Sequence, residues 1–190
     1  MKGGYVVWMP LQRLKNRGEI PAHLPVYLDS PMAIEATELY CRHRQLLRVP
    51  QGEMARLVEH VHLITTGAQS QRLARSQMSA RMPAVILSAS GMATGGRIMH
   101  HLANRLPDPN TIVLFTGYQA EETLGRQLME GANSVSIFGQ PISVAAQIRT
   151  LTNFSAHADQ REILDWLKQM PKPPKHVFLT HGEDGPRATL

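Results

Sequence analysis

Short apolar segments alternate with longer, more polar segments along most of this chain. Residues 84–87 are a continuous apolar run of the kind that buried parallel strands show, and residues 111–115 read as another buried strand. Alternation of such runs with helical patterns predicts an α/β fold in which a mainly parallel sheet is flanked by helices. The predicted strands are 25–28, 61–66, 84–87, 111–115 and 176–180, with one or two more in 134–150; the predicted helices are a helix end at 11–18, then 32–47, 69–80, 95–106, 120–130 and 159–170.

Composition narrows the class of protein further. A formal net charge of +5 suits a polyanionic partner, although solvated basic faces of this size are common. The single cysteine, Cys41, excludes an intramolecular disulfide and fits a reducing compartment, so we expect a cytoplasmic protein. No apolar run approaches the length of about 18 residues that a membrane span needs, and we expect no membrane association.

A glycine-rich loop follows the apolar run at 84–87 and opens the next predicted helix. Backbone amides and the positive end of a helix dipole attract anions at such a junction, and hydroxyl groups add donors. The spacing of two glycines imitates a P-loop, but Arg97 and Ile98 stand where a nucleotide-binding lysine and a magnesium-binding hydroxyl belong, so an ATPase is rejected. A tight turn that merely requires small residues is an equally good interpretation. The candidate phosphate ligands are Ser88, Ser90, Gly91, Gly95, Gly96 and Arg97.

Two histidines near the end of the chain are the strongest candidates for chemistry. His157 lies just before Asp159, which has the spacing of a helix cap with Glu162. An imidazole at this place has a pKa that suits general acid catalysis. His181 ends the predicted strand 176–180, where metal ligands are often placed. Each histidine taken alone is more simply a loop residue, so the residues themselves indicate metal or phosphate chemistry without deciding between them.

Five motifs resemble, in the same order, those of the β-CASP branch of the metallo-β-lactamase superfamily, which contains RNA-processing nucleases. They lie at 26–33, 87–92, 115–120, 154–159 and 180–183. The resemblance implies a parallel β-CASP sheet flanked by helices at 11–135. It also implies a partial return into the metallo-β-lactamase αββα sandwich at 136–190.

The resemblance also implies roles for single residues. His157 matches the histidine that protonates the leaving oxygen, and His181 matches a ligand of the second of two zinc ions. In the family, a hydroxide shared by two zinc ions attacks the RNA phosphodiester, and the metals balance the charge on both oxygens. The glycine-rich loop then holds an RNA phosphate. The implied supporting residues are Asp29, Ser30, Ser155, Asp159 and Glu183.

The chain also departs from the family pattern. The main zinc signature, His-x-His-x-Asp-His, is absent, and a single histidine cannot hold a catalytic zinc. We therefore expect a fragment that binds zinc weakly and does not cut RNA alone. The expected protein partners are a second copy of this chain, in a homo-oligomer, or a chain carrying the missing zinc-binding domain, and the second of these would complete the site. The alternative is a non-catalytic RNA-binding module that keeps the phosphate loop.

Overall fold

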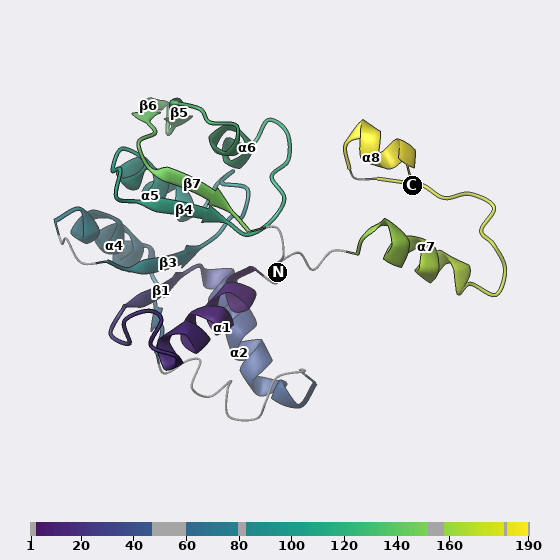
Figure 1. Ribbon diagram of the computed structural model, residues 1–190, viewed down its shortest axis with the longest axis horizontal. Coiled ribbons are helices and arrows are strands. Elements are labelled where there is room, and N and C mark those ends of the chain that lie inside the picture. Colours follow the sequence, from purple (N-terminus) through teal and green to yellow (C-terminus); the bar gives the residue numbers. More distant parts are fainter. Residues whose placement is uncertain (1–2, 47–59, 80–82, 152–157, 181, 190) are drawn as a thin grey trace. The chain divides into compact units, whose positions relative to one another are not determined.

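The computed structural model describes residues 3–46, 60–79, 83–151, 158–180 and 182–189. It divides into two compact units, Met1–Ser155 and Ala156–Leu190. The predicted fold class is confirmed, since parallel strands are flanked by helices (Figure 1). The predicted division of the chain at residue 135 stays a prediction. Among the described residues, no helix is both long enough and apolar enough to cross a bilayer.

The first sheet of the larger unit has three parallel strands in the order β2-β1-β3. They are β1 (Val26–Asp29), β2 (His62–Leu63) and β3 (Val85–Ser88), and β1 lies in the middle, with Leu28 opposite both Leu63 and Leu87. The helices in this part are α1 (Gly3–Asn16), α2 (Pro31–Arg42), the 3₁₀ turn η1 (Arg44–Leu46) and α4 (Gly67–Ser79). Val26 is 1% exposed and is the centre of a small apolar cluster. Central strands of parallel sheets are buried on both faces, which explains the apolar sequence of β1.

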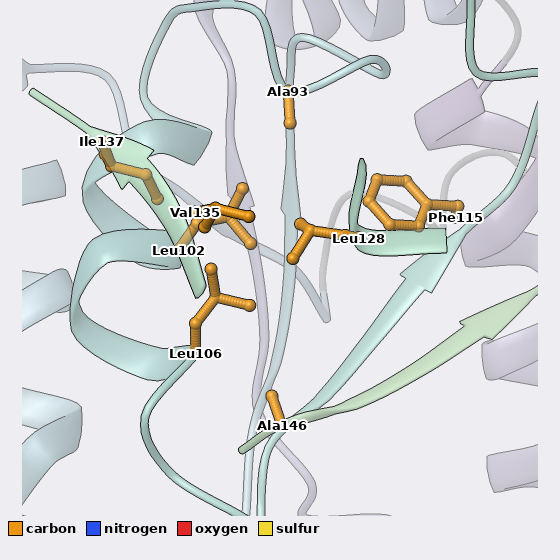
Figure 2. Packing of buried hydrophobic residues seen from close by; sticks show 8 residues of the cluster. All are labelled: Ala93, Leu102, Leu106, Phe115, Leu128, Val135, Ile137 and Ala146. Atoms are coloured by element: carbon orange, nitrogen blue, oxygen red, sulfur yellow. The ribbon is translucent and has the colours of Figure 1, made fainter. Parts of the chain in front are cut away.

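The second part of this unit contains a parallel pair and a hairpin. Strand β4 (Ile112–Phe115) pairs with β7 (Gln147–Thr150), and β5 (Ser134–Ile137) pairs antiparallel with β6 (Gln140–Ser143). Helices α5 (Ile98–Arg105) and α6 (Leu124–Met129) belong here. The core unites the glycine-rich loop, both helices and the strands; Figure 2 shows its buried members Ala93, Leu102, Leu106, Phe115, Leu128, Val135, Ile137 and Ala146.

Three predictions about strands need correction. Segment 134–150 forms three strands and not one or two; β5 and β6 pair with each other, and β7 pairs with β4. The strand predicted at 61–66 is much shorter, since β2 is only two residues long. Strand β4 is not buried on both faces, because Ile112 and Leu114 are 61% and 44% exposed. These two side chains share one face of β4, since alternate residues of a strand point to the same side.

The smaller unit confirms its predicted helix but not its predicted strand. Helix α7 (Gln160–Lys168) begins at Asp159, whose carboxylate accepts from the backbone N–H of Glu162 while Glu162 accepts from the backbone of Asp159. The predicted strand at 176–180 is wrong: this segment is irregular and exposed. A strand needs a neighbour that accepts its hydrogen bonds, and the described residues of this unit provide none. Helix α8 (Asp184–Thr189) follows and was not predicted.

Candidate phosphate-binding site at the carboxyl edge of the parallel sheet

The candidate site lies where strands β1 and β3 end. Parallel strands place their carboxyl ends at one edge of the sheet, and ligands of α/β proteins bind outside that edge. Strand β1 ends at Asp29 and is followed by α2, whose N-cap Ser30 accepts a hydrogen bond from the N–H of Ala33 at 3.3 Å. Strand β3 ends at Ser88 and is followed by the glycine-rich loop and α5. The predicted position of the loop, between a strand and a helix, is confirmed.

A buried carboxylate organises this edge of the sheet. Asp29 is 0% exposed. One of its oxygens, Oδ1, accepts from Nη1 of Arg97 at 2.9 Å, and Oδ2 accepts from Oγ of Ser70 at 2.6 Å. Oδ2 also lies 2.7 Å from Nε2 of His101. A carboxylate that is buried away from solvent needs such partners, because an unpaired buried charge is strongly destabilising. The carboxylate therefore joins β1 to helices α4 and α5.

Arg97 is held by the protein more tightly than the sequence indicated. Besides Asp29, its Nη1 donates to the carbonyl of Ile64 at 2.6 Å and its Nη2 donates to the carbonyl of Thr65 at 3.1 Å. The planar guanidinium thus ties the start of α5 to the ends of β1 and β2. Its role as an RNA phosphate ligand stays a prediction, but the geometry gives it a positioning role first. Ser88 is also engaged, since its hydroxyl donates to the carbonyl of Asp29 at 2.9 Å.

The tip of the loop presents hydroxyl groups to solvent. Oγ of Ser90 accepts from the backbone N–H of Thr94 at 3.1 Å and lies 3.1 Å from Oγ1 of Thr94. Only one of the two hydroxyl protons can bridge this pair, so the other is free to donate to a ligand. Gly91, Thr94 and Gly96 are exposed, so a ligand can reach the tip.

Backbone amides add donors next to these hydroxyls. The N–H of Ile98 donates to the carbonyl of Ala89 at 3.3 Å, which folds the loop over the start of α5. Within the described residues, the backbone N–H groups of Gly95, Gly96 and Arg97 donate to no protein atom. Consecutive unpaired N–H groups at the start of a helix are suited to an anion. The donors of the loop are therefore chemically suited to a phosphate group.

A buried glutamine fixes the far side of the loop. Gln119 is 2% exposed, and its Nε2 donates to the carbonyl of Gly91 at 2.9 Å and to the carbonyl of Gly117 at 3.1 Å. The N–H of Gly125, in α6, donates to the carbonyl of Met92 at 3.1 Å. The motif at 115–120 thus supports the loop mechanically, a task that the sequence did not reveal.

The buried ring of His101 makes the site sensitive to acid. Burial lowers the pKa of His101, the neighbouring charges of Arg105 and His100 lower it as well, and the hydrogen bond and charge of Asp29 act in the opposite direction. Nδ1 has no partner among the described residues, which fits a neutral ring that donates from Nε2 to Asp29.

We expect the pH dependence of stability to reflect this ring. A lowered pKa means that the unfolded chain binds the proton more readily, so this contribution is present above about pH 6.5 and is lost as the pH falls below it. Urea unfolding at about pH 7.5 and about pH 5.5 should show a larger loss of stability for the wild type than for His101→Gln. Equal losses in both proteins would contradict a neutral His101.

The predicted residues of the hydrolytic chemistry lie at 155–183 of the sequence. Ser155, His157 and His181 fall outside the described residues. Asp159 caps α7, and the carbonyl of Glu183 accepts from the N–H of Arg187 at 3.0 Å. The functional roles of all five stay predictions.

Sequence reasoning missed Ser70, His101 and Gln119 as members of the site. The spacing in the sequence could have indicated His101, because it lies four residues after Arg97 and residues four apart share a helix face.

The zinc that the resemblance implies has no complete set of ligands in the described part of the chain. No group of three His, Cys, Asp or Glu side chains lies close enough together there to hold a metal ion. Asp29 and His101 form a pair, but both oxygens of Asp29 already have partners in Ser70, Arg97 and His101, and a metal ion needs more protein ligands than the Nδ1 of one histidine.

Fold and site together define an α/β protein with a glycine-rich loop between a strand and a helix at the carboxyl edge of a parallel sheet. The chain belongs to the Beta-Casp domain family, whose sequence model matches residues 7–128. A second model, the Zn-dependent metallo-hydrolase RNA specificity domain, matches residues 141–188.

Similar proteins carry names from RNA metabolism and transcription. Ribonuclease TTHA0252 of Thermus thermophilus is 37% identical over 90% of this chain and 39% of its own length. Transcription termination factor FttA of Pyrococcus abyssi is 31% identical over 93% of this chain and 28% of its own length. An RNase J-like protein of Methanocaldococcus jannaschii is 33% identical over 84% of this chain and 36% of its own length. The chain thus spans well under half the length of these relatives.

Proposed function

We propose that this chain is the RNA-binding part of a β-CASP ribonuclease, and that its glycine-rich loop holds an RNA phosphate. The observation that carries this proposal is the group of donors at one place: three unpaired backbone N–H groups at 95–97 and the exposed Ser90–Thr94 hydroxyl pair. Phosphate oxygens are strong acceptors, and the N-terminus of a helix is a common place for them. The net charge of +5 favours the same partner.

The anchoring of the loop supports the proposal. Asp29 and Arg97 fix the start of α5, and Gln119 fixes the opposite side of the loop. Donors held in place before binding lose little conformational entropy when the ligand arrives. Since the hydroxyl of Ser88 and the guanidinium of Arg97 already have partners, we assign direct phosphate contact first to Ser90, Thr94, Gly95 and Gly96.

Hydrolysis of the phosphodiester belongs, in this proposal, to the complete zinc-dependent protein. His157 would donate the proton to the leaving oxygen, and His181 would be a zinc ligand. Zinc would supply an activated hydroxide and balance the charge of the phosphate. The second candidate is a non-catalytic RNA-binding module, which the metal-independent donors of the loop favour.

Substitution of Thr94 tests the phosphate site. Thr94→Val removes one loop hydroxyl at almost constant volume, and we expect RNA affinity to fall at least about tenfold, since one hydrogen bond to a charged group is lost. The control is Thr37→Val, because the Thr37 hydroxyl donates to the carbonyl of Ala33 within α2. Fluorescence anisotropy with a short labelled single-stranded RNA measures both.

Salt and a chelator separate the two functions. Affinity should fall steeply as salt rises from about 50 to about 200 mM, because bound phosphates release counterions. Binding that survives chelation without any RNA cleavage by this chain favours the binding module. Zinc-dependent cleavage that is lost in His157→Ala favours the hydrolase. Affinity that is independent of salt and of Thr94 would contradict the phosphate site.

A further inference from the structure

A groove lined by polar and aromatic side chains lies beside helices α4 and α5, away from the loop tip. It has a volume of about 280 Å³. Gln71 and Arg75 line it from α4, His100 and Asn104 from α5, and Phe138 from the turn between β5 and β6. No acidic side chain is among the described residues that line it. A groove with this lining suits a ligand that combines a flat apolar face with negative charge.

Phe138 has an unusual backbone conformation for such a large residue. Its φ is +52°, and that of the following Gly139 is +74°. Two residues with positive φ between paired strands form the tight hairpin turn in which asparagine or glycine normally occupies the first position. The left-handed conformation costs a bulky residue about 1–2 kcal/mol. Phe138 is also 61% exposed, so burial of the ring does not offset this cost. An exposed, strained aromatic residue is a reason to look for a function.

A second ring holds the phenylalanine in a defined orientation. The centroids of His100 and Phe138 are 4.8 Å apart, with an angle of 34° between the ring planes. This distance and tilt lie in the range of favourable aromatic pairs. His100 and His101 point in different directions, since His101 contacts Asp29. Helix α5 therefore has the phosphate loop at its start and the aromatic pair on another face of its first turn.

The charge of the groove comes from α4. Arg75 is exposed and lines the groove, and Arg72 is exposed one turn earlier on the same helix. Gln71 and Asn104 add amide groups that can donate or accept hydrogen bonds. Single-stranded nucleic acid is bound by this combination, in which bases stack on aromatic rings and phosphates contact basic side chains.

We propose that this groove binds one nucleotide of single-stranded RNA, with its base stacked on Phe138 and its phosphate against Arg75. This site is separate from the glycine-rich loop, and its RNA ligand rests on the function proposed above. Because α5 contributes to both places, one RNA strand can occupy the loop and the groove. Stacking is tolerant of base identity, so the groove gives affinity with little sequence preference.

The turn itself provides a sharp test. Phe138→Asn removes the ring and introduces the residue that this turn prefers, so the hairpin should remain at least as stable. We expect the affinity of the full chain for a fluorescein-labelled oligouridine to fall at least about fivefold, because one base loses its stacking partner. Phe138→Trp should retain wild-type affinity, and its indole fluorescence should be quenched by the RNA.

Two further measurements identify the contact. An oligonucleotide of the same length without bases should bind Phe138→Asn and the wild type equally, since the ring contacts only the base. Arg75→Gln should lower the slope of log affinity against log salt by about one, as expected for one phosphate contact.

The outcomes distinguish this site from the loop. Unchanged oligouridine affinity in Phe138→Asn overturns the groove, and a Thr94→Val effect in the same assay would then leave the loop proposal standing. An equal loss for the oligonucleotide without bases would overturn base stacking. If the wild type binds no RNA, both proposals fail. Unchanged oligouridine affinity in Phe138→Asn is also the result expected if the groove binds a protein partner and not RNA.

Discussion

Asp29→Asn should destabilise the larger unit by about 3–5 kcal/mol, which is the usual cost of removing one partner of a buried ion pair. The substitution keeps the size of the side chain but leaves the guanidinium of Arg97, whose side chain is 17% exposed, without its counter-charge. It also disturbs the hydrogen bonds of Ser70 and His101. Urea unfolding followed by circular dichroism measures the change.

The matched control for this experiment is Glu19→Gln. Glu19 pairs with Arg17 on the surface, where both side chains are more than half exposed, and such pairs contribute about 1 kcal/mol or less. A loss of stability in Asp29→Asn no larger than in Glu19→Gln would contradict the organising role of Asp29. Because Asp29 pairs with Arg97, the substitution Arg97→Glu would not test RNA binding alone. It would place a second carboxylate beside Asp29 and damage the fold itself.

Gly96→Ala should destabilise the protein by about 1–3 kcal/mol, because a side chain at positive φ is strained. The φ of Gly96 is +78°, and an added Cβ would lie 2.9 Å from the carbonyl oxygen of Ala89. The neighbour Gly95 is the control, because a Cβ there would meet nothing within 4 Å. We expect Gly95→Ala to change stability by less than about 0.5 kcal/mol.

The same pair of variants reports on the loop as a binding site. Gly96→Ala shifts the backbone that carries the unpaired N–H groups, so RNA affinity should fall with stability. Thermal unfolding and RNA titrations of the two variants, side by side, make the comparison. Equal melting temperatures for Gly95→Ala and Gly96→Ala would mean that the loop does not have the conformation described above.

Local sequence signals predicted the local parts of the fold and site. The spacing of Asp159 and Glu162 predicted the capping box of α7, and the glycines after the apolar run at 84–87 predicted the loop. Each of these depends on interactions between residues a few positions apart. Such interactions can be read from spacing alone.

Tertiary contacts determine the parts of the fold and of the site that could not be predicted from the sequence. Ser70 lies 41 positions from Asp29, and His101 lies 72 positions from it, so the sequence around Asp29 did not indicate their contacts with its carboxylate. The apolar segment 176–180 had the composition of a strand, but composition does not provide a hydrogen-bonding neighbour. Arg97 had the position of a phosphate ligand, and only the fold revealed the buried carboxylate that holds it.

The central claim is that the glycine-rich loop contacts RNA. Amide nitrogen–proton NMR spectra of the chain, recorded while single-stranded RNA is added, test it most directly because each backbone N–H reports separately. We predict that clear shifts occur at Thr94, Gly95 and Gly96 as RNA is added. Shifts that are absent from residues 90–97 while RNA is bound would contradict the account.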